Sequence, residues 1–327
     1  MAEVDRLDVL NRTMRRMVSG GVVRQKTLKR DIECAGIALH SGLTVNMRIC
    51  SAAPDSGIRF RRTDVDSKIG EVEARHDNVV ETRLCTTIAN EHGVKVSTIE
   101  HLMAAFAGAE IDNAVVEVDG VEVPIMDGSA APFIEMIEGA GVIEQGLPRK
   151  AIRILQTVSV RDGSKFLKFE PADRATVNLE IEFECDSIGR QSLALPVTKD
   201  AFRDDVADAR TFGFLHEVEA LRAAGLARGG SLDNAVVLSE GKVLNEEGLR
   251  YGDEFVRHKI LDCIGDLYLA GSPIIAAVSG SCSGHGLNNA LLLALFEDES
   301  AWVWETIEDV HSANAPAWET EPALMPA

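Results

Sequence analysis

The sequence predicts an α+β protein of two similar halves, each a small β-sheet with a pair of helices. In both halves, stretches that alternate apolar and polar residues are separated by turn-forming residues, a pattern typical of antiparallel strands. The pentapeptide Asp-Asn-Ala-Val-Val occurs at residues 112–116 and again at 233–237. A helical stretch precedes each copy, and a glycine-containing turn and a second helix follow it. Such self-similarity indicates a duplicated architecture.

The alternating stretches divide the chain into two domains. A chain of 327 residues is long enough for two cores of ordinary size. We expect an N-terminal extension at 1–22, a first domain at 23–147, a second domain at 148–304 and an acidic tail at 305–327. The linker is expected at 144–150. The predicted strands lie at 26–33, 40–50 and 57–62 in the first half and at 151–161, 165–169 and 176–183 in the second.

The composition is that of a soluble globular protein, with 46% hydrophobic and 26% charged residues. The net charge of -19 and the isoelectric point near 4.8 argue against a nucleic-acid partner, because neutralising phosphates requires clustered Lys and Arg. The six cysteines include no Cys-x-x-Cys pair, so neither a disulfide framework nor a thiolate zinc site is indicated. A reducing cytoplasm fits this pattern.

The chain lacks the features of a secretory signal or a membrane span. Residues 1–20 place apolar residues in a helical rhythm without a continuous apolar core, so we expect a short surface helix there. The longest apolar run, at 290–296, is far shorter than a membrane span. We therefore expect a cytoplasmic protein without stable membrane insertion.

The helix predicted at 254–266 combines an apolar stripe with a polar one. His258, Asp262 and Asp266 fall at positions i, i+4 and i+8, so all three project from one side of the helix. An imidazole and a carboxylate one turn apart can bind a single Zn²⁺, and the second Asp can orient a neighbouring group. The alternative is a solvated face with an ordinary His/Asp pair. The apolar stripe consists of Phe255, Ile260, Leu261, Ile264 and Leu267.

A second helix, beginning near Ser97, offers a third ligand. Ser97 and Glu100 have the spacing of a capping box, which by itself explains the glutamate. It does not explain His101, which interrupts an apolar run. A carboxylate beside a metal-binding histidine is the arrangement that metallohydrolases use for a general base. If the halves pack helix against helix, His101 can complete a zinc site with His258 and Asp262.

One further histidine has a special setting. His285 lies between Gly284 and Gly286, which let the backbone approach a ligand closely, and a helix is expected from Leu287. A carboxylate such as Asp266 can hold the imidazole protonated, as a general acid requires. The alternative is an exposed loop histidine. The other histidines are expected to be structural or solvated: His40, His76, His92, His216 and His311.

Several separated motifs, spread from about Gln25 to Trp304, carry a family resemblance. They are Gly36-Ile-Ala-Leu-His-Ser-Gly42, Ser97-Thr-Ile-Glu-His101, residues 111–133 with Val123-Pro-Ile-Met-Asp-Gly128, Ala209-Arg-Thr-Phe-Gly-Phe214, Gly230-Ser-Leu-Asp-Asn234, residues 255–266, and Ser283-Gly-His-Gly-Leu-Asn-Asn289. In combination they resemble the zinc-dependent UDP-3-O-acyl-N-acetylglucosamine deacetylases, which catalyse the committed step of lipid A synthesis in Gram-negative bacteria.

The resemblance implies a fold, a reaction and a set of roles. Members of that family have two similar α+β domains with the helices packed between the two sheets, and we expect a monomer of this kind. The reaction removes the N-acetyl group of UDP-3-O-(3-hydroxyacyl)-N-acetylglucosamine and yields acetate. The implied roles are zinc binding by His101, His258 and Asp262, general base for Glu100, general acid for His285 with Asp266, stabilisation of the oxyanion and substrate by Thr211 and Lys259, binding of the UDP end by Lys165, Phe183 and Phe212, and lining of the sugar pocket by Cys85.

Two positions depart from the family pattern. Cys282 stands where relatives commonly carry a basic residue near the pyrophosphate, and Ala38 replaces a usual glycine. A zinc deacetylase of another N-acetylated nucleotide sugar is therefore an alternative, as is a non-catalytic binding protein on the same scaffold.

The acyl chain is expected on an amphipathic helix within 212–230, although the same residues could be core. These residues are Phe214, Leu215, Val218, Leu221 and Leu226.

Overall fold

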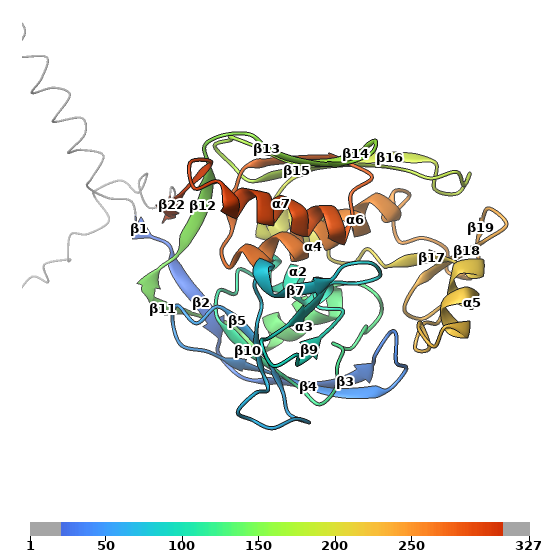
Figure 1. Ribbon diagram of the computed structural model, residues 1–327, viewed down its shortest axis with the longest axis horizontal. Coiled ribbons are helices and arrows are strands. Elements are labelled where there is room, and N and C mark those ends of the chain that lie inside the picture. Colours follow the sequence, from blue (N-terminus) through green and yellow to red (C-terminus); the bar gives the residue numbers. More distant parts are fainter. Residues whose placement is uncertain (1–20, 310–327) are drawn as a thin grey trace, which may run out of the picture.

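The computed structural model describes residues 21–309 (Figure 1). Within them the chain forms six α-helices and several small sheets, so the prediction of a mixed α+β protein is confirmed. The helices are α2 (Glu100–Gly108), α3 (Ala131–Ala140), α4 (Lys199–Asp205), α5 (Leu215–Ala223), α6 (Glu254–Leu267) and α7 (His285–Glu297).

The first large sheet has the strand order β3-β4-β10-β5-β6. β4 is antiparallel to β3 and β10, whereas β10 is parallel to β5. Along β4, Val45, Met47 and Ile49 are buried while Asn46 and Arg48 are exposed, so one face of the sheet covers the core. The strands are β3 (Ile32–Ile37), β4 (Thr44–Ser51), β5 (Ile58–Arg62), β6 (Glu71–Glu73) and β10 (Ala114–Val118).

The second large sheet has the order β13-β14-β21-β15-β16 and the same pattern of strand directions. Its middle strand β21 is antiparallel to β14 and parallel to β15. In each sheet the middle strand lies between two helices along the chain, α2 and α3 around β10 and α6 and α7 around β21. The strands are β13 (Val158–Asp162), β14 (Lys165–Glu170), β15 (Thr176–Glu182), β16 (Arg190–Pro196) and β21 (Ala277–Ser281).

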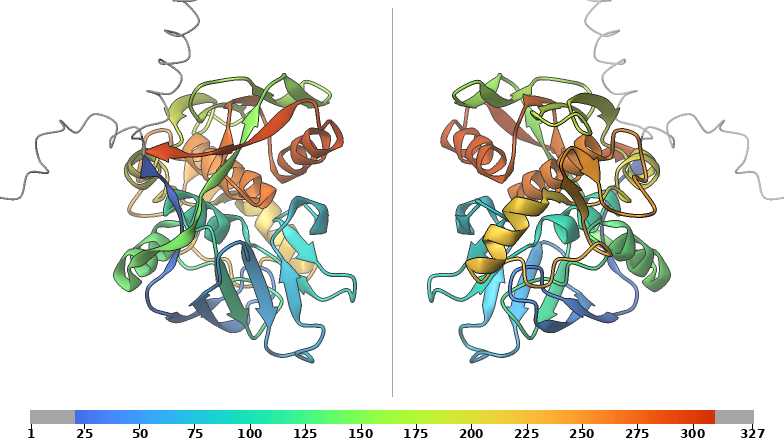
Figure 2. Two further views of the ribbon diagram at one scale, coloured as in Figure 1. Left: turned by 90° about the vertical axis from the view of Figure 1, so that its left-hand side faces the viewer. Right: turned by 90° about the vertical axis from the view of Figure 1, so that its right-hand side faces the viewer.

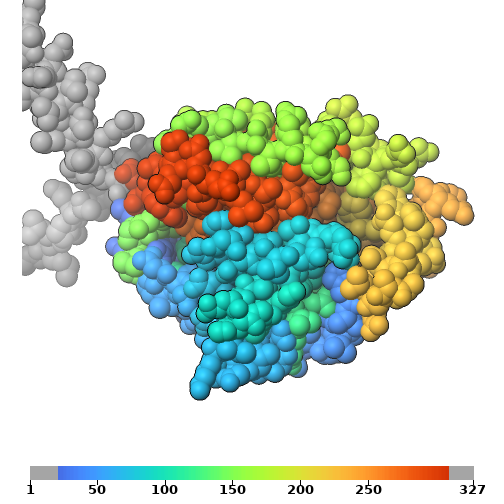
Figure 3. Space-filling view, viewed as in Figure 1, coloured from blue at the N-terminus to red at the C-terminus, as the bar shows by residue number. Residues whose placement is uncertain are grey.

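The two large sheets lie on opposite sides of the molecule, with α2, α6 and α7 between them, whereas α5 lies at one end beside β17 and β18 (Figures 1 and 2). α2 packs along α6, and the buried apolar side chains form one continuous cluster that includes residues of both sheets. The first half of the chain and most of the second occupy separate regions that meet along a seam on the surface (Figure 3). Residues of α2 and α6 therefore meet in the middle layer.

Smaller sheets surround this central arrangement. Their orders are β17-β18-β19, β7-β8-β9 and β20-β12-β22, with two-stranded pairs β11-β2 and β1-β23. Their strands are β1 (Gly21–Val22), β2 (Arg24–Leu28), β7 (Val79–Glu81), β8 (Thr87–Ala89), β9 (Lys95–Val96), β11 (Val142–Pro148), β12 (Lys150–Ile154), β17 (Phe212–Phe214), β18 (Val236–Ser239), β19 (Lys242–Val243), β20 (Ile274–Ile275), β22 (Trp302–Thr306) and β23 (Glu308–Asp309).

The repeated pentapeptide does not mark equivalent positions. Its first copy, at 112–116, leads into β10, the middle strand of the first large sheet. Its second copy, at 233–237, leads into β18, which belongs to a small sheet with β17 and β19. The counterpart of β10 in the second large sheet is β21. The two copies of the pentapeptide therefore occupy different places in the fold, because a five-residue identity reports similar local composition and not tertiary position.

Several predicted element boundaries were wrong. The strands predicted at 26–33 and 151–161 are each broken, into β2 and β3 and into β12 and β13. Most of the predicted linker at 144–150 lies in β11, which pairs with β2. Strand periodicity continues across a short turn, so alternation alone does not locate these breaks.

The part of the chain that the structure describes contains no helix long and apolar enough to cross a membrane. The surface helix predicted within residues 1–20 lies outside the described residues, as do His311 and most of the predicted acidic tail.

We predict that replacing Gly265 with alanine destabilises the protein by about 1–3 kcal/mol, the usual cost of overpacking a core. α2 and α6 touch backbone to backbone, since a Cβ at Gly265 would lie 2.0 Å from the carbonyl oxygen of Glu100 and 2.9 Å from the amide nitrogen of Ala104. The matched control is Gly139→Ala in α3, where a Cβ meets nothing within 4 Å. That control should be neutral or stabilising by up to about 1 kcal/mol. Equal urea midpoints for both variants would contradict the close crossing.

Candidate metal centre and active site

The packing of α2 against α6 brings three predicted ligands together. His101 is the second residue of α2, and His258 and Asp262 lie one turn apart on α6. One ligand atom from each residue lies within 4.8 Å of those of the other two. The Asp262 carboxylate oxygen Oδ1 is 3.4 Å from Nε2 of His258 and 3.6 Å from Nε2 of His101. All three side chains are buried.

The backbone orients one of these ligands. Nδ1 of His258 is 3.0 Å from the carbonyl oxygen of Ala209, and because a carbonyl can only accept, Nδ1 donates. The neutral ring therefore presents its lone pair at Nε2, on the side of Asp262. Burial lowers the pKa of His258 to about 3. The imidazole is thus held neutral, in the tautomer that can bind a metal through Nε2.

The three residues fit a divalent cation. Nδ1 of His101 and Oδ1 of Asp262 are buried and lack a hydrogen-bond partner among the described residues. Leaving buried polar atoms unpaired costs free energy, which a bound cation can offset. Burial would raise the pKa of Asp262, but His258 and Lys259 lower it well below its usual value, so the group is a carboxylate. Two imidazoles and one carboxylate form a common ligand set of catalytic metal sites.

An acid–base pair lies beside the three ligands. Nε2 of His285 is 4.0 Å from Oε1 of Glu100, and its Nδ1 is 2.7 Å from Oδ2 of Asp266. Burial raises the pKa of Glu100, which makes this carboxylate a better proton acceptor near neutral pH. Burial would lower the pKa of His285, but the Asp266 charge raises it to about 10. His285 therefore carries a proton at neutral pH.

Glu100 does not form the predicted capping box. α2 begins at Glu100 itself, and its cap residue Ile99 makes no side-chain capping hydrogen bond. The Glu100 carboxylate accepts instead from the backbone N–H of Thr86, at 3.0 Å, and the Ser97 hydroxyl bonds to Thr87. The structural explanation for Glu100 was wrong, and its carboxylate faces His285.

The remaining predicted substrate residues divide into two groups. The ring centre of Phe212 lies 6.3 Å from the ring centre of His258 and 5.7 Å from that of Phe183. Lys259 places its ammonium 5.6 Å from the Phe212 ring centre and 3.1 Å from Asp262. By contrast, Lys165 has an exposed side chain at the start of β14, and no contact among the described residues joins it to this cluster.

Two cavities are lined by residues predicted to bind or position the substrate. One, of about 440 Å³, is lined by Cys85 together with Leu84, His40 and Ser97. Burial raises the pKa of the Cys85 thiol to about 12, so it is a neutral lining group and not a nucleophile. The other cavity, of about 390 Å³, is described below with α5. Both volumes lie in the range of about 300–1,000 Å³ typical of ligand pockets.

The second cavity is shared by predicted site residues and the predicted acyl-binding segment. Thr211 and Phe212 line it, together with three apolar residues of α5: Leu215, Val218 and Leu221. The predicted helix within 212–230 proves to be β17 followed by α5, and α5 has no buried residue. The apolar side chains of α5 therefore line a cavity rather than a core. Phe214 and Leu226, also predicted for the acyl chain, line neighbouring cavities instead.

The family model LpxC, UDP-3-O-acyl N-acetylglycosamine deacetylase, matches residues 25–297. The chain belongs to this family. It is 51% identical over 290 residues to the UDP-3-O-acyl-N-acetylglucosamine deacetylase of Phenylobacterium zucineum, covering 88% of this chain and 99% of the relative. The protein of the same name from Chromobacterium violaceum is 48% identical, over 88% of this chain and 95% of the relative.

A more distant relative gives the same result. The UDP-3-O-acyl-N-acetylglucosamine deacetylase of Vibrio parahaemolyticus is 44% identical over 306 residues, which is 93% of this chain and 99% of the relative. The LpxC family membership predicted from separated motifs is therefore confirmed over most of the chain.

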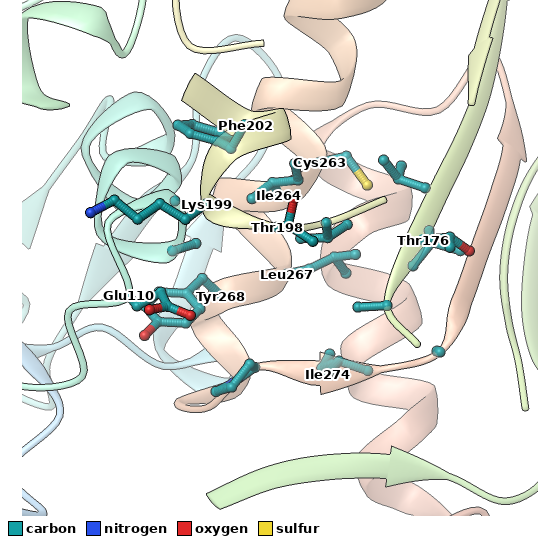
Figure 4. A pocket seen from close by; sticks show the side chains of 18 of the residues that line it. Glu110, Thr176, Thr198, Lys199, Phe202, Cys263, Ile264, Leu267, Tyr268 and Ile274 are labelled. Carbon is teal, nitrogen blue, oxygen red and sulfur yellow. The ribbon is translucent and has the colours of Figure 1, made fainter. Parts of the chain in front are cut away.

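A further cavity lies on another face of α6 (Figure 4). Phe202, Cys263, Ile264 and Leu267 line it, and its volume is about 130 Å³. This volume is well below the range of about 300–1,000 Å³ typical of ligand pockets. None of the predicted site residues lines it.

Sequence reasoning missed the residues that support the acid–base pair. Asp266 accepts hydrogen bonds from the hydroxyl of Thr86, at 2.5 Å, and from the side-chain amide of Asn288, at 2.8 Å. Both donors are buried. α7 begins at His285 and not at Leu287, so Asn288 lies on its first turn near His285. The motif from Ser283 to Asn289 contained Asn288, but neither its spacing nor its type indicated its partner.

Proposed function

We propose that this chain hydrolyses the N-acetyl group of UDP-3-O-(3-hydroxyacyl)-N-acetylglucosamine with the help of zinc, as a step of lipid A biosynthesis. The products are acetate and the free amino sugar. The observation that carries this proposal is the buried group of His101, His258 and Asp262 beside Glu100 and His285, in a chain of the LpxC family.

Zinc is the metal that we propose for this group. His101, His258 and Asp262 would hold it, and two nitrogens with one oxygen suit zinc in hydrolases. When bound, zinc supplies Lewis acidity, which polarises the amide carbonyl and lowers the pKa of a water molecule toward about 7.

The acid–base pair supplies the proton transfers. Glu100 accepts a proton from the attacking water, and its raised pKa suits that role. His285 donates a proton to the nitrogen that leaves, which avoids the release of an amine anion. Asp266 keeps His285 protonated through the hydrogen bond to Nδ1. Each proton-transfer residue contributes roughly 10²–10⁴ in rate.

Thr211 and Lys259 stabilise the charge that develops on the carbonyl oxygen. The Thr211 hydroxyl can donate a hydrogen bond, and the Lys259 ammonium lies 3.1 Å from Asp262, at the edge of the proposed zinc site. Removing one such donor costs about 10²–10³ in rate in other hydrolases.

Residues around the two cavities bind the substrate. Phe183 and Phe212 offer aromatic faces for the UDP end, and Lys165 contributes charge there. Cys85 lines the pocket for the sugar. The acyl chain occupies the cavity lined by α5, whose apolar side chains face that cavity.

We also propose the domain organisation predicted from the sequence, with similar domains at 23–147 and 148–304 and the helices as the middle layers. The identical strand order of the two large sheets supports it. The protein is proposed to act as a cytoplasmic monomer. The free thiols of all six cysteines are compatible with a reducing compartment.

The decisive test measures zinc content and acetate release in parallel. We expect about one zinc per chain in the wild type, loss of zinc and activity in His258→Ala, and retained zinc with a loss of roughly 10²–10⁴ in rate in Glu100→Gln. The control is His92→Ala, which replaces an exposed histidine whose Nε2 lies 3.6 Å from Oε1 of Glu91 and should match the wild type. Zinc binding without acetate release would indicate a binding protein instead. Equal turnover of acylated and unacylated UDP-N-acetylglucosamine would indicate a different nucleotide sugar.

We predict a bell-shaped dependence of kcat/KM on pH. Activity should fall as the pH drops through the raised pKa of Glu100, which must be ionised to accept a proton. It should also fall as the pH rises through about 10, where His285 loses the proton that it donates. Asp266→Asn removes the charge that raises the His285 pKa, so the basic limb should move to lower pH. The acidic limb should move less, because burial is the main cause of the Glu100 shift. An unmoved basic limb would contradict the assignment of His285.

We predict that Leu221→Asp selectively weakens the binding of substrates with a long acyl chain. A charge in the apolar cavity opposes burial of an acyl chain, and each buried CH₂ contributes about 0.8 kcal/mol. The matched control is Ala220→Asp, an exposed position on the same helix. Steady-state kinetics with a short and a long acyl chain should show a larger rise in KM for the long one. An equal rise in KM for the short-chain and long-chain substrates would exclude binding of the acyl chain at α5.

A further inference from the structure

Thr86 links the two proton-transfer groups. It precedes β8 and has only 1% of its surface exposed. Its backbone N–H donates to Oε2 of Glu100 at 3.0 Å, and its hydroxyl lies 2.5 Å from Oδ1 of Asp266. Its carbonyl oxygen accepts from the N–H of Ile99 at 3.5 Å. All three polar groups of this one residue are thus directed to the start of α2 and to α6.

The hydroxyl of Thr86 acts as a donor to Asp266. An ionised carboxylate can only accept hydrogen bonds, and Asp266 accepts on Oδ2 from His285 and from Asn288. Thr86 therefore saturates the other oxygen, Oδ1. With donors on both oxygens, the carboxylate cannot rotate without breaking a buried hydrogen bond, which costs about 1–3 kcal/mol. The ring of His285 is held through this fixed carboxylate.

The same residue fixes the position of the base. The Thr86 N–H holds one oxygen of Glu100, which leaves Oε1 directed at Nε2 of His285, 4.0 Å away. The four residues form a ring of contacts. Thr86 bonds to Glu100, Glu100 lies 4.0 Å from His285, His285 bonds to Asp266, and Asp266 bonds to the Thr86 hydroxyl. Because the backbone and the side chain of Thr86 belong to one residue, the separation of base and acid is set by a short covalent path.

We propose that Thr86 is a positioning residue, which sets the distance and orientation between Glu100 and the His285–Asp266 pair through its hydroxyl. This inference rests on the proposed function, since it concerns the proton transfers of the deacetylation. Threonine suits the role because its β-branched side chain has few accessible χ1 rotamers, so the hydroxyl is aimed with little loss of freedom.

The first experiment compares two replacements of Thr86. Valine keeps the shape and the backbone N–H to Glu100 but removes the hydroxyl, whereas serine keeps the hydroxyl. We expect Thr86→Val to lower kcat by about 10–100-fold, which is the usual effect of losing a group that orients a metal ligand or a catalytic side chain. KM and zinc content should remain near the wild-type values. Thr86→Ser should recover most of the lost kcat.

The matched control is Thr27→Val. Thr27 is also a buried threonine, 3% exposed, and its hydroxyl donates to the carbonyl oxygen of Asn113, in another part of the first half. Its replacement removes a comparable buried hydroxyl and should lower the unfolding midpoint without changing kcat. A loss of kcat in Thr27→Val as large as that in Thr86→Val would reduce the effect to general destabilisation and overturn the proposal.

A double-mutant cycle tests whether Thr86 acts through Asp266. In an Asp266→Ala background the Thr86 hydroxyl has no carboxylate to hold. Adding Thr86→Val to that background should therefore change kcat by less than about threefold. If the two residues acted independently, the fold-losses in kcat of the two single variants would multiply. The proposal would be rejected if the fold-losses in kcat multiply in the double variant, or if the single variant Thr86→Val keeps the kcat of the wild type. Absence of acetate release from the wild type, assayed in parallel, would instead reject the proposed function.

Discussion

The close crossing of α2 and α6 is the constraint on which the site depends. Gly265 lies directly against the carbonyl oxygen of Glu100, so the first turn of α2 packs closely against α6. This contact places His101 beside His258 and Asp262, although more than 150 residues separate them in the chain. A wider crossing would leave each helix intact and would separate the ligands. The site therefore exists only because two backbones approach without an intervening side chain.

The same crossing buries an unusual number of polar groups in the middle layer. Glu100, His101, His258, Asp262 and Asp266 are each less than 5% exposed, between two sheets whose inner faces are apolar. Burial of ionisable groups is unfavourable unless each finds a partner. Most do, through backbone groups and buried side chains, and one unpaired atom is Oδ1 of Asp262, which lies 3.4 Å from Nε2 of His258 and 3.6 Å from Nε2 of His101. Desolvation thus raises the pKa of Glu100 and keeps His258 neutral, the states that the proposed chemistry requires.

Sequence reasoning succeeded where the relevant geometry is local and failed where it is not. The stripe of His258, Asp262 and Asp266 follows from the helical repeat alone, and the structure keeps all three on one side of α6. The repeated pentapeptide and the capping box were local patterns as well, but they were read as evidence of tertiary position and of a capping role. The two pentapeptides occupy different places, one in a large sheet and one in a small sheet, and Glu100 bonds to Thr86 instead of forming a capping box with Ser97.

The sequence by itself determined the family, the mixed α+β class and the residue types of the candidate site, since these depend on periodicity and on motifs within single segments. Only the tertiary structure decided which groups support them. Thr86 meets Asp266 across 180 positions of the chain, and Ala209 orients His258 from a separate loop. Nothing in the local sequence of a threonine or an alanine encodes such a partner. These contacts follow from how α2, α6 and the neighbouring loops pack together, which is a property of the packed core as a whole.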